Sequence, residues 1–285
     1  MHHKLLITFI LVGITTLTGI QVQAASEIRF GVHPFKKPNK IFHMFQPLVM
    51  DLEKRMGIPV KLIIGKSYAD IINKHKRAEI DFGYFGPASF IKAQKATQIT
   101  PLARIQMNGK GAFRGVILVN ENSSIKNLSQ LKGHNFAFGD PNSTLSHYVP
   151  HYMLLKAGIK LNMLGNYAFT GNHDNVALNI MYGNFDAGGL KPDVAKQYLK
   201  RGLRILAHSE WIPEHLFAAN KHLEKGLRIK LRKALLKTDV RILQKIKPSI
   251  SGIEVARSRD YDKLRKIIET VDKQDPPDKL RTTYR

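Results

Sequence analysis

Short apolar runs alternate with stretches of helically spaced apolar residues along most of the chain. The runs predict strands at residues 27–32, 60–64, 80–84, 115–119, 135–138, 167–169, 185–190 and 203–207. Apolar positions three and four apart predict helices at 41–56, 68–76, 172–182, 223–246 and 261–271. Two further helices are expected to begin at Gly86-Pro87 and after the turn 139–144, and a short one is expected to end at Lys132-Gly133. This alternation indicates an α/β fold with a parallel sheet that helices cover on both faces.

The order of elements restarts once, after the strand at 115–119. It predicts two βα lobes joined by a hinge with a cleft between them, residues 25–117 and 209–274 forming lobe 1 and residues 118–208 forming lobe 2. Residues 275–285 carry two prolines and several charges without periodicity, so we expect a flexible tail there. Ligands of open α/β sheets bind beyond the carboxyl ends of strands, so the turns after these strands should face the cleft.

The first residues have the pattern of a secretory signal. Lys4 precedes an apolar stretch at 5–20, and Val22-Gln23-Ala24 follows it. The stretch falls short of the roughly 20 residues that a membrane-spanning helix needs. We therefore expect a signal peptide at 1–24, cleavage near Ala24 or Ala25, and a mature chain in the periplasm. The sequence has no cysteine, so it offers no thiol for a lipid anchor.

The charge is strongly positive, with 45 Lys and Arg against 22 Asp and Glu, or +23 in total. Such a balance raises the local concentration of anions. Export argues against nucleic acid as the partner, and the basic residues are not interleaved with the stacking aromatics of single-strand binders. A small anionic solute fits the charge, and a surface adapted to the organism's envelope is the alternative.

The segment 138–147, Phe-Gly-Asp-Pro-Asn-Ser-Thr-Leu-Ser-His, is the strongest chemical signal. A strand ends, the chain turns, and Ser143, Thr144 and Ser146 gather where a helix begins. Backbone N–H groups, the positive end of the helix and these hydroxyls together can hold a tetrahedral oxyanion. A plain capping turn is the alternative, because Ser, Thr, Asn and Asp are ordinary helix starters.

Several segments resemble the periplasmic phosphate/phosphite/phosphonate-binding proteins of ABC transporters. They are Gly31-Val32-His33-Pro34, the run from Asp81 to Ser89, the turn just described, the run from Gly171 to Leu178, and Asp186-Ala187-Gly188. The resemblance covers about residues 28–267. It implies a type II periplasmic binding fold without catalytic activity or cofactor, a monomer that binds a small phosphorus oxyanion and hands it to an ABC permease.

The same resemblance implies ligand-binding residues. Ser143 and Thr144 match the first two positions of a Ser-Thr-Ser run that holds the anion; Leu145 replaces the third, and Ser146 follows it. His173 matches a histidine that touches the anion. Tyr68 matches a tyrosine that reaches the ligand from lobe 1, whereas Phe85 falls on a second such tyrosine and lacks its hydroxyl.

Two further positions bear on the substituent of the ligand. Asp193 matches an acidic residue that holds the ammonium of aminophosphonates, and His215 stands where another member has Asp. An imidazole in place of a carboxylate removes a negative charge and adds a donor. The sequence therefore favours phosphite, phosphate or a simple alkylphosphonate.

Other functions have weaker support. The chain has no cysteine nucleophile, no nucleophile-elbow pattern and no convincing ligand set, which argues against an enzyme. His147 and His151 are four residues apart, but Pro150 intervenes and no third ligand is evident, so we expect no metal. A module that docks on a membrane signalling receptor is the alternative that sequence does not separate from a transport protein.

Overall fold

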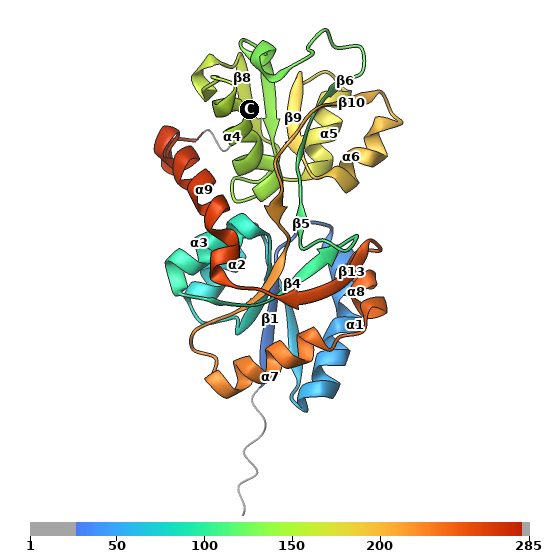
Figure 1. Cartoon of the computed structure of the whole chain (residues 1–285), viewed down its shortest axis with the longest axis vertical. Coiled ribbons are helices and arrows are strands. Elements are labelled where there is room, and N and C mark those ends of the chain that lie inside the picture. The colour runs from blue at the N-terminus through green and yellow to red at the C-terminus, as the bar shows by residue number, and fades with distance from the viewer. Residues whose placement is uncertain (1–26, 281–285) are drawn as a thin grey trace, which may run out of the picture.

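Two β-sheets with flanking helices form two lobes stacked along the long axis of the computed structural model, which describes residues 27–280 (Figure 1). The sheet of lobe 1 has the order β13-β4-β12-β3-β1-β2. Its strands are β1 (Ile28–Val32), β2 (Val60–Ile64), β3 (Phe82–Phe85), β4 (Thr100–Met107), β12 (Leu216–Ala219) and β13 (Ile250–Val255). The expected signal at 1–24 lies outside the described residues.

The sheet of lobe 2 has the order β10-β6-β9-β7-β8. Its strands are β6 (Val116–Asn120), β7 (Asn135–Phe138), β8 (Asn166–Phe169), β9 (Ala187–Leu190) and β10 (Leu203–His208). Between the lobes, β5 (Ala112–Phe113) pairs with β11 (Ile212–Pro213) where the chain crosses in each direction. The two crossings lie side by side at the waist of the molecule and form the hinge (Figure 1).

Both sheets are mixed, and the expectation of parallel sheets is wrong in this respect. In lobe 1, β1 pairs in parallel with β2 and β3, whereas β12, β4 and β13 are antiparallel to their neighbours. In lobe 2, β7 is parallel to β8 and β9, and β6 is antiparallel to β9 and β10. Four of these strands, β4, β6, β10 and β12, directly precede or follow a crossing, where the chain changes lobes.

Helices cover both faces of each sheet, as predicted. They are α1 (Pro38–Met56), α2 (Tyr68–Lys76), α3 (Pro87–Thr97), α7 (Lys225–Leu236) and α8 (Val240–Ile246) in lobe 1, and α4 (Val149–Lys156), α5 (His173–Met181) and α6 (Pro192–Leu199) in lobe 2. The single helix predicted at 223–246 is wrong. The chain breaks before Asp239, whose carboxylate accepts a hydrogen bond from the backbone N–H of Arg241 at 2.8 Å and so begins a second helix.

Helix α9 (Asp262–Gln274) runs from lobe 1 to lobe 2 along one side of the molecule (Figure 1). The hydroxyl of Tyr148 donates to Asp272 at 3.2 Å, and a ring nitrogen of His151 lies 3.0 Å from the carboxylate of Asp275. Leu280 packs into the core of lobe 2. The expected flexible tail is therefore wrong for residues 275–280, because a hydrogen bond and an apolar contact hold them against lobe 2.

Replacing Asp275 with alanine should lower the free energy of unfolding by about 1–3 kcal/mol. The side chain of His151 is fully buried, so the change leaves a ring N–H without its acceptor. Urea denaturation of Asp275→Ala measures the loss, and Asp278→Ala, an exposed carboxylate three residues away in the described part of the chain, is the control. Equal midpoints for the two variants would contradict the role assigned to this pair.

Candidate functional site

A small cavity lies between the lobes and is called the inner cavity here. Lobe 1 and the crossings contribute Tyr68, Gly86, Phe113 and His215, and lobe 2 contributes Ser143, Thr144, Leu145, His173 and Lys191. Gly86 directly follows β3 and Lys191 directly follows β9, while the turn with Ser143 follows β7. The ends of strands from both sheets thus meet at one place, and five of the eight predicted site residues line it.

The hydroxyls of Ser143 and Thr144 keep their protons available for a ligand. The Ser143 hydroxyl accepts from the backbone N–H of Ser146 at 3.2 Å, and the Thr144 hydroxyl accepts from the backbone N–H of Ala88 at 2.9 Å. Neither hydroxyl donates to another group within residues 27–280, so each can still donate one hydrogen bond. Residues Thr144–Tyr148 form a turn of π-helix, a form found often at functional sites.

His173 begins α5 and is held in one orientation. Its Nδ1 accepts a hydrogen bond from the backbone N–H of Lys191 at 3.3 Å, so in the neutral ring the proton sits on Nε2. Burial, with the positive charge of Lys191 nearby, lowers the pKa of His173 well below its usual 6.5. The ring is therefore a neutral donor.

Lys191 supplies the positive charge of the inner cavity, and sequence reasoning missed it. Its side chain is 15% exposed, and its ammonium lies 5.3 Å from the centre of the Phe35 ring and 3.8 Å from Asp193. Burial lowers the pKa of Lys191, while the carboxylate of Asp193 opposes that change. The available signal was Leu190-Lys191-Pro192, a lysine between a predicted strand and a proline that starts a helix.

His215 and Glu214 form a pair at the opposite wall. One carboxylate oxygen of the buried Glu214 accepts from both the backbone N–H and Nδ1 of His215, each at 2.9 Å. Burial acts to raise the pKa of Glu214, but these bonds hold it below its usual value. Nε2 of His215 lies on the far side of the ring, beside Gly86 and the Thr144 hydroxyl.

Two further hollows continue from the inner cavity. The neck shares Tyr68, Phe113, His173, Lys191 and His215 with it and adds Phe35, Tyr84, Ile105, Glu214, Ile246 and Lys247. The outer pocket shares Phe113, Glu214 and Lys247 with the neck and adds Met107, Asn108, Lys110, Ala112, Arg114, Pro192, Asp193, Lys196, Trp211 and Ser249.

Three predicted site residues lie outside the wall of the inner cavity. Phe85 is fully buried and packs on His75 with ring centres 4.9 Å apart, so its assignment is wrong; Tyr84, one residue earlier, lines the neck. Ser146 is buried with its hydroxyl directed at the backbone of Gly139. Asp193 lies in the outer pocket, 3.2 Å from the ammonium of Lys247.

The charge of Asp193 is already balanced. Burial acts to raise the pKa of Asp193, but Lys191 and Lys247 lower it to about 2. A carboxylate that contacts two ammonium groups attracts a third cation weakly. This pairing argues against the expectation that Asp193 holds the ammonium of an aminophosphonate.

The lobes touch across the cleft. Lys36 of lobe 1 pairs with Asp174 of lobe 2 at 2.8 Å, and Lys247 pairs with Asp193 at 3.2 Å. The ammonium of Lys92 in α3 lies 3.0 Å from the side-chain oxygen of Asn142, in the turn before Ser143. These contacts join the two lobes through residues that neighbour Ser143, His173 and Lys191 in the sequence.

Within residues 27–280, no helix is long and apolar enough to cross a membrane. The same part of the chain holds no group of three metal-ligating side chains. His147 and His151 lie in the interior, where a nitrogen of His147 is 2.7 Å from the carbonyl oxygen of Pro141.

A family model described as the periplasmic substrate-binding protein of the phosphonate ABC transporter matches residues 30–261. A probable phosphite-binding protein of an ABC transporter from Prochlorococcus marinus is 28% identical over 232 residues, which are 75% of this chain and 78% of that protein. A phosphate-import protein of Mycolicibacterium smegmatis is 27% identical over 218 residues, which are 70% of this chain and 68% of that protein.

Solved structures show the same fold. The Prochlorococcus marinus protein PhnD1, in complex with methylphosphonate, superposes with a TM-score of 0.78 at 25% identity and covers 87% of this chain and 98% of its own. A binding component of a phosphonate ABC transporter from Pseudomonas aeruginosa gives a TM-score of 0.76 at 20% identity, with 87% of both chains covered.

Proposed function

Because the chain belongs to the family of periplasmic substrate-binding proteins of ABC phosphonate transporters, we propose that it closes its two lobes around one phosphorus oxyanion in the inner cavity. The convergence of Ser143, Thr144, His173 and Lys191 on one small space carries the proposal. Proteins of this family bind a substrate for import and are not enzymes. The wall accordingly offers donors and one cation around the space for the ligand.

Each group has a distinct task in this proposal. The hydroxyls of Ser143 and Thr144 donate to two oxygens of the anion, and Nε2–H of His173 donates to a third. Lys191 balances the negative charge, and the hydroxyl of Tyr68, whose pKa burial raises, remains a donor. Hydrogen bonds to a charged group contribute about 1.5–3 kcal/mol each, and four of them suffice for micromolar affinity, roughly −8 kcal/mol.

Closure follows from the origin of these groups. Lys191 and His173 belong to lobe 2, whereas Tyr68 and His215 approach from lobe 1 and the crossing. An anion that contacts both sides favours the closed form by the difference in its affinity for the two forms. The permease then receives the closed, loaded protein, and the family's place in ABC transporters favours this role over docking on a signalling receptor.

The ligand in this proposal is phosphite, phosphate or a phosphonate without an ammonium group. Relatives are named for phosphite and phosphate, and a solved relative holds methylphosphonate. Asp193 is paired with Lys191 and Lys247, and His215 presents an imidazole, so no free carboxylate awaits an amine. We also propose that residues 1–24 are a cleaved signal and that the mature protein acts as a monomer.

We expect phosphite, phosphate and methylphosphonate to bind the mature protein more tightly than 2-aminoethylphosphonate in isothermal titration calorimetry. Ser143→Ala should weaken the tightest of these ligands roughly 10- to 100-fold, because one hydrogen bond to a charged oxygen is lost. Ser123→Ala is the matched control. Its hydroxyl also accepts from a backbone N–H at 3.2 Å, but it lines none of the three hollows.

Tightest binding by 2-aminoethylphosphonate would overturn the assignment of Asp193 and His215. Unchanged binding in Ser143→Ala would mean that the anion does not bind at the turn that follows β7. Failure of every phosphorus oxyanion to bind, with sulfate or an organic anion binding instead, would overturn the proposed function.

A further inference from the structure

We propose that the ligand site extends through the neck into the outer pocket, and that the outer pocket accepts an anionic group at the far end of the ligand. The ligand class is an alkylphosphonate whose chain ends in a carboxylate. The inference rests on the proposed function, because the phosphonate end must occupy the inner cavity. It adds a second point of recognition beyond the inner cavity, which shares five wall residues with the neck.

The three hollows are neighbours that share walls. Phe113 lines all three, and Glu214 and Lys247 line both the neck and the outer pocket. The outer pocket is the largest, with a volume of about 980 Å³ including its open side. A substituent that leaves the inner cavity by the neck therefore arrives in the outer pocket.

The walls of the neck suit an alkyl chain. Phe35, Ile105 and Ile246 are apolar, and Tyr84 and Phe113 present aromatic rings. The carboxylate of Glu214 is engaged by His215, so this path holds no free negative charge. Methylene groups can pass along such a surface and are stabilised by removal from water.

The outer pocket has an excess of positive charge. Lys110, Arg114, Lys196 and Lys247 line it together with two carboxylates, Asp193 and Glu214. Lys247 pairs with Asp193, and Glu214 pairs with His215. No ion-pair partner for the other three cations exists in the described part of the chain, which leaves this pocket ready for an anion.

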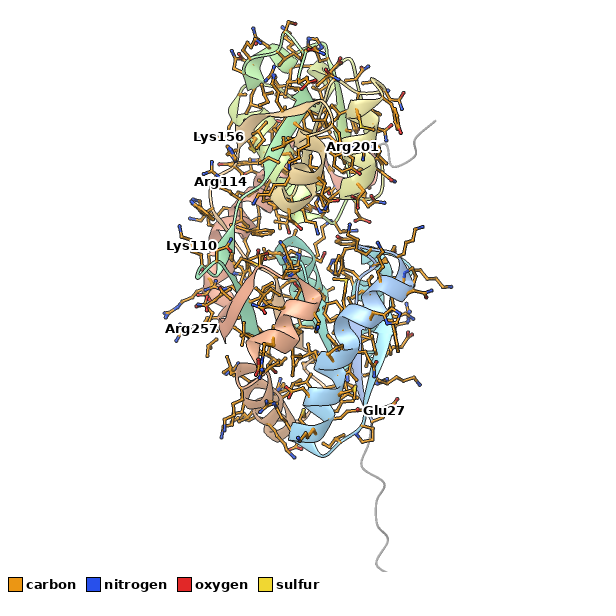
Figure 2. The ribbon with its side chains drawn as sticks, turned by 90° about the vertical axis from the view of Figure 1, so that its right-hand side faces the viewer. Glu27, Lys110, Arg114, Lys156, Arg201 and Arg257 are labelled. Atoms are coloured by element: carbon orange, nitrogen blue, oxygen red, sulfur yellow. The ribbon has the colours of Figure 1, made fainter. Side chains whose placement is uncertain are left out.

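Arg114 is the most specific of these cations. Its Nε is buried and has no hydrogen-bond partner among residues 27–280. Its guanidinium lies 5.7 Å from the centre of the Trp211 ring, and the ammonium of Lys110 lies 4.9 Å from the same centre. Trp211 is 49% exposed. Lys110 and Arg114 lie on the same side of the waist between the lobes (Figure 2). An aromatic ring flanked by two cations makes a fixed surface on which a carboxylate can be bound by Arg114.

Calorimetry with methylphosphonate, propylphosphonate, phosphonoacetate and 3-phosphonopropionate tests the inference on the mature protein. We expect at least one of the two carboxylate-ended ligands to bind about tenfold more tightly than propylphosphonate. We expect Arg114→Met to abolish that advantage. Lys200→Met is the control, because Lys200 is exposed at the end of α6 and lines none of the hollows.

Equal binding of propylphosphonate and both carboxylate-ended ligands, or an advantage that survives in Arg114→Met, would overturn the inference while leaving the proposed function intact. Failure of methylphosphonate as well would overturn the proposed function.

Discussion

Replacing Lys191 with methionine should weaken the binding of methylphosphonate about 100-fold, or about 2.7 kcal/mol. Lys191 is the one ammonium group that lines the inner cavity among residues 27–280. Its side chain is 15% exposed, so little water remains to screen its attraction for an anion. Without it, the anion enters a partly buried site that no ammonium group lines among residues 27–280.

The substitution is informative because it leaves the neighbouring groups in place. The backbone N–H of Lys191, which holds Nδ1 of His173, is unchanged by a new side chain. Asp193 keeps its ion pair with Lys247. Isothermal titration calorimetry should therefore report a loss of affinity without a loss of the folded state, and Lys200→Met should bind like the unaltered protein. An affinity for Lys191→Met within about threefold of the original would mean that the anion lies elsewhere.

The turn that carries Ser143 and Thr144 could be predicted because its signal is local. A buried strand at 135–138 ends in Gly139, and small polar residues that cap helices follow directly. Position at a strand end and side-chain chemistry both point to the same place. The orientation of the hydroxyls could not be predicted, because the partner of Thr144 is the N–H of Ala88 in the other lobe, 56 residues away.

Phe85 lines none of the three hollows, whereas Tyr84, one residue earlier, lines the neck, and the difference has a physical reason. Side chains along a strand alternate between faces, so Tyr84 and Phe85 point in opposite directions. In a surface strand, alternating polarity would reveal which face is buried. All four residues of β3 are buried, so the pattern gives no such sign. Only the packing of His75 on one face and His215 on the other distinguishes them.

Strand direction and the role of Lys191 required the tertiary structure. The predicted alternation of strands and helices holds for β1, β2 and β3, which are parallel. It says nothing of β12 and β13, which the chain adds to lobe 1 after returning from lobe 2. A lysine at the end of a strand is unremarkable in a chain with 45 Lys and Arg, and only its burial beside His173 singles it out.

Gly86 offers a test of the cavity that does not remove any donor. A β-carbon at this position would lie 3.7 Å from both Nε2 of His215 and the hydroxyl of Thr144, which is ordinary contact distance. The backbone angles of Gly86, φ −68° and ψ 149°, suit alanine before a proline. The added methyl group therefore fits the folded protein but takes up space where groups from the two lobes meet.

We expect Gly86→Ala to keep or slightly raise the free energy of unfolding, by about 0.4–1 kcal/mol, while weakening methylphosphonate about 100-fold. The stability gain comes from a less flexible unfolded chain, and the loss of affinity comes from a cavity too small for the anion. Gly226→Ala, in α7 and away from all three hollows, is the matched control and should change stability alone. Urea denaturation and calorimetry on the same preparations separate the two effects. Methylphosphonate binding that survives in Gly86→Ala would show that the anion does not lie between His215 and Thr144, because the added methyl group takes up that space.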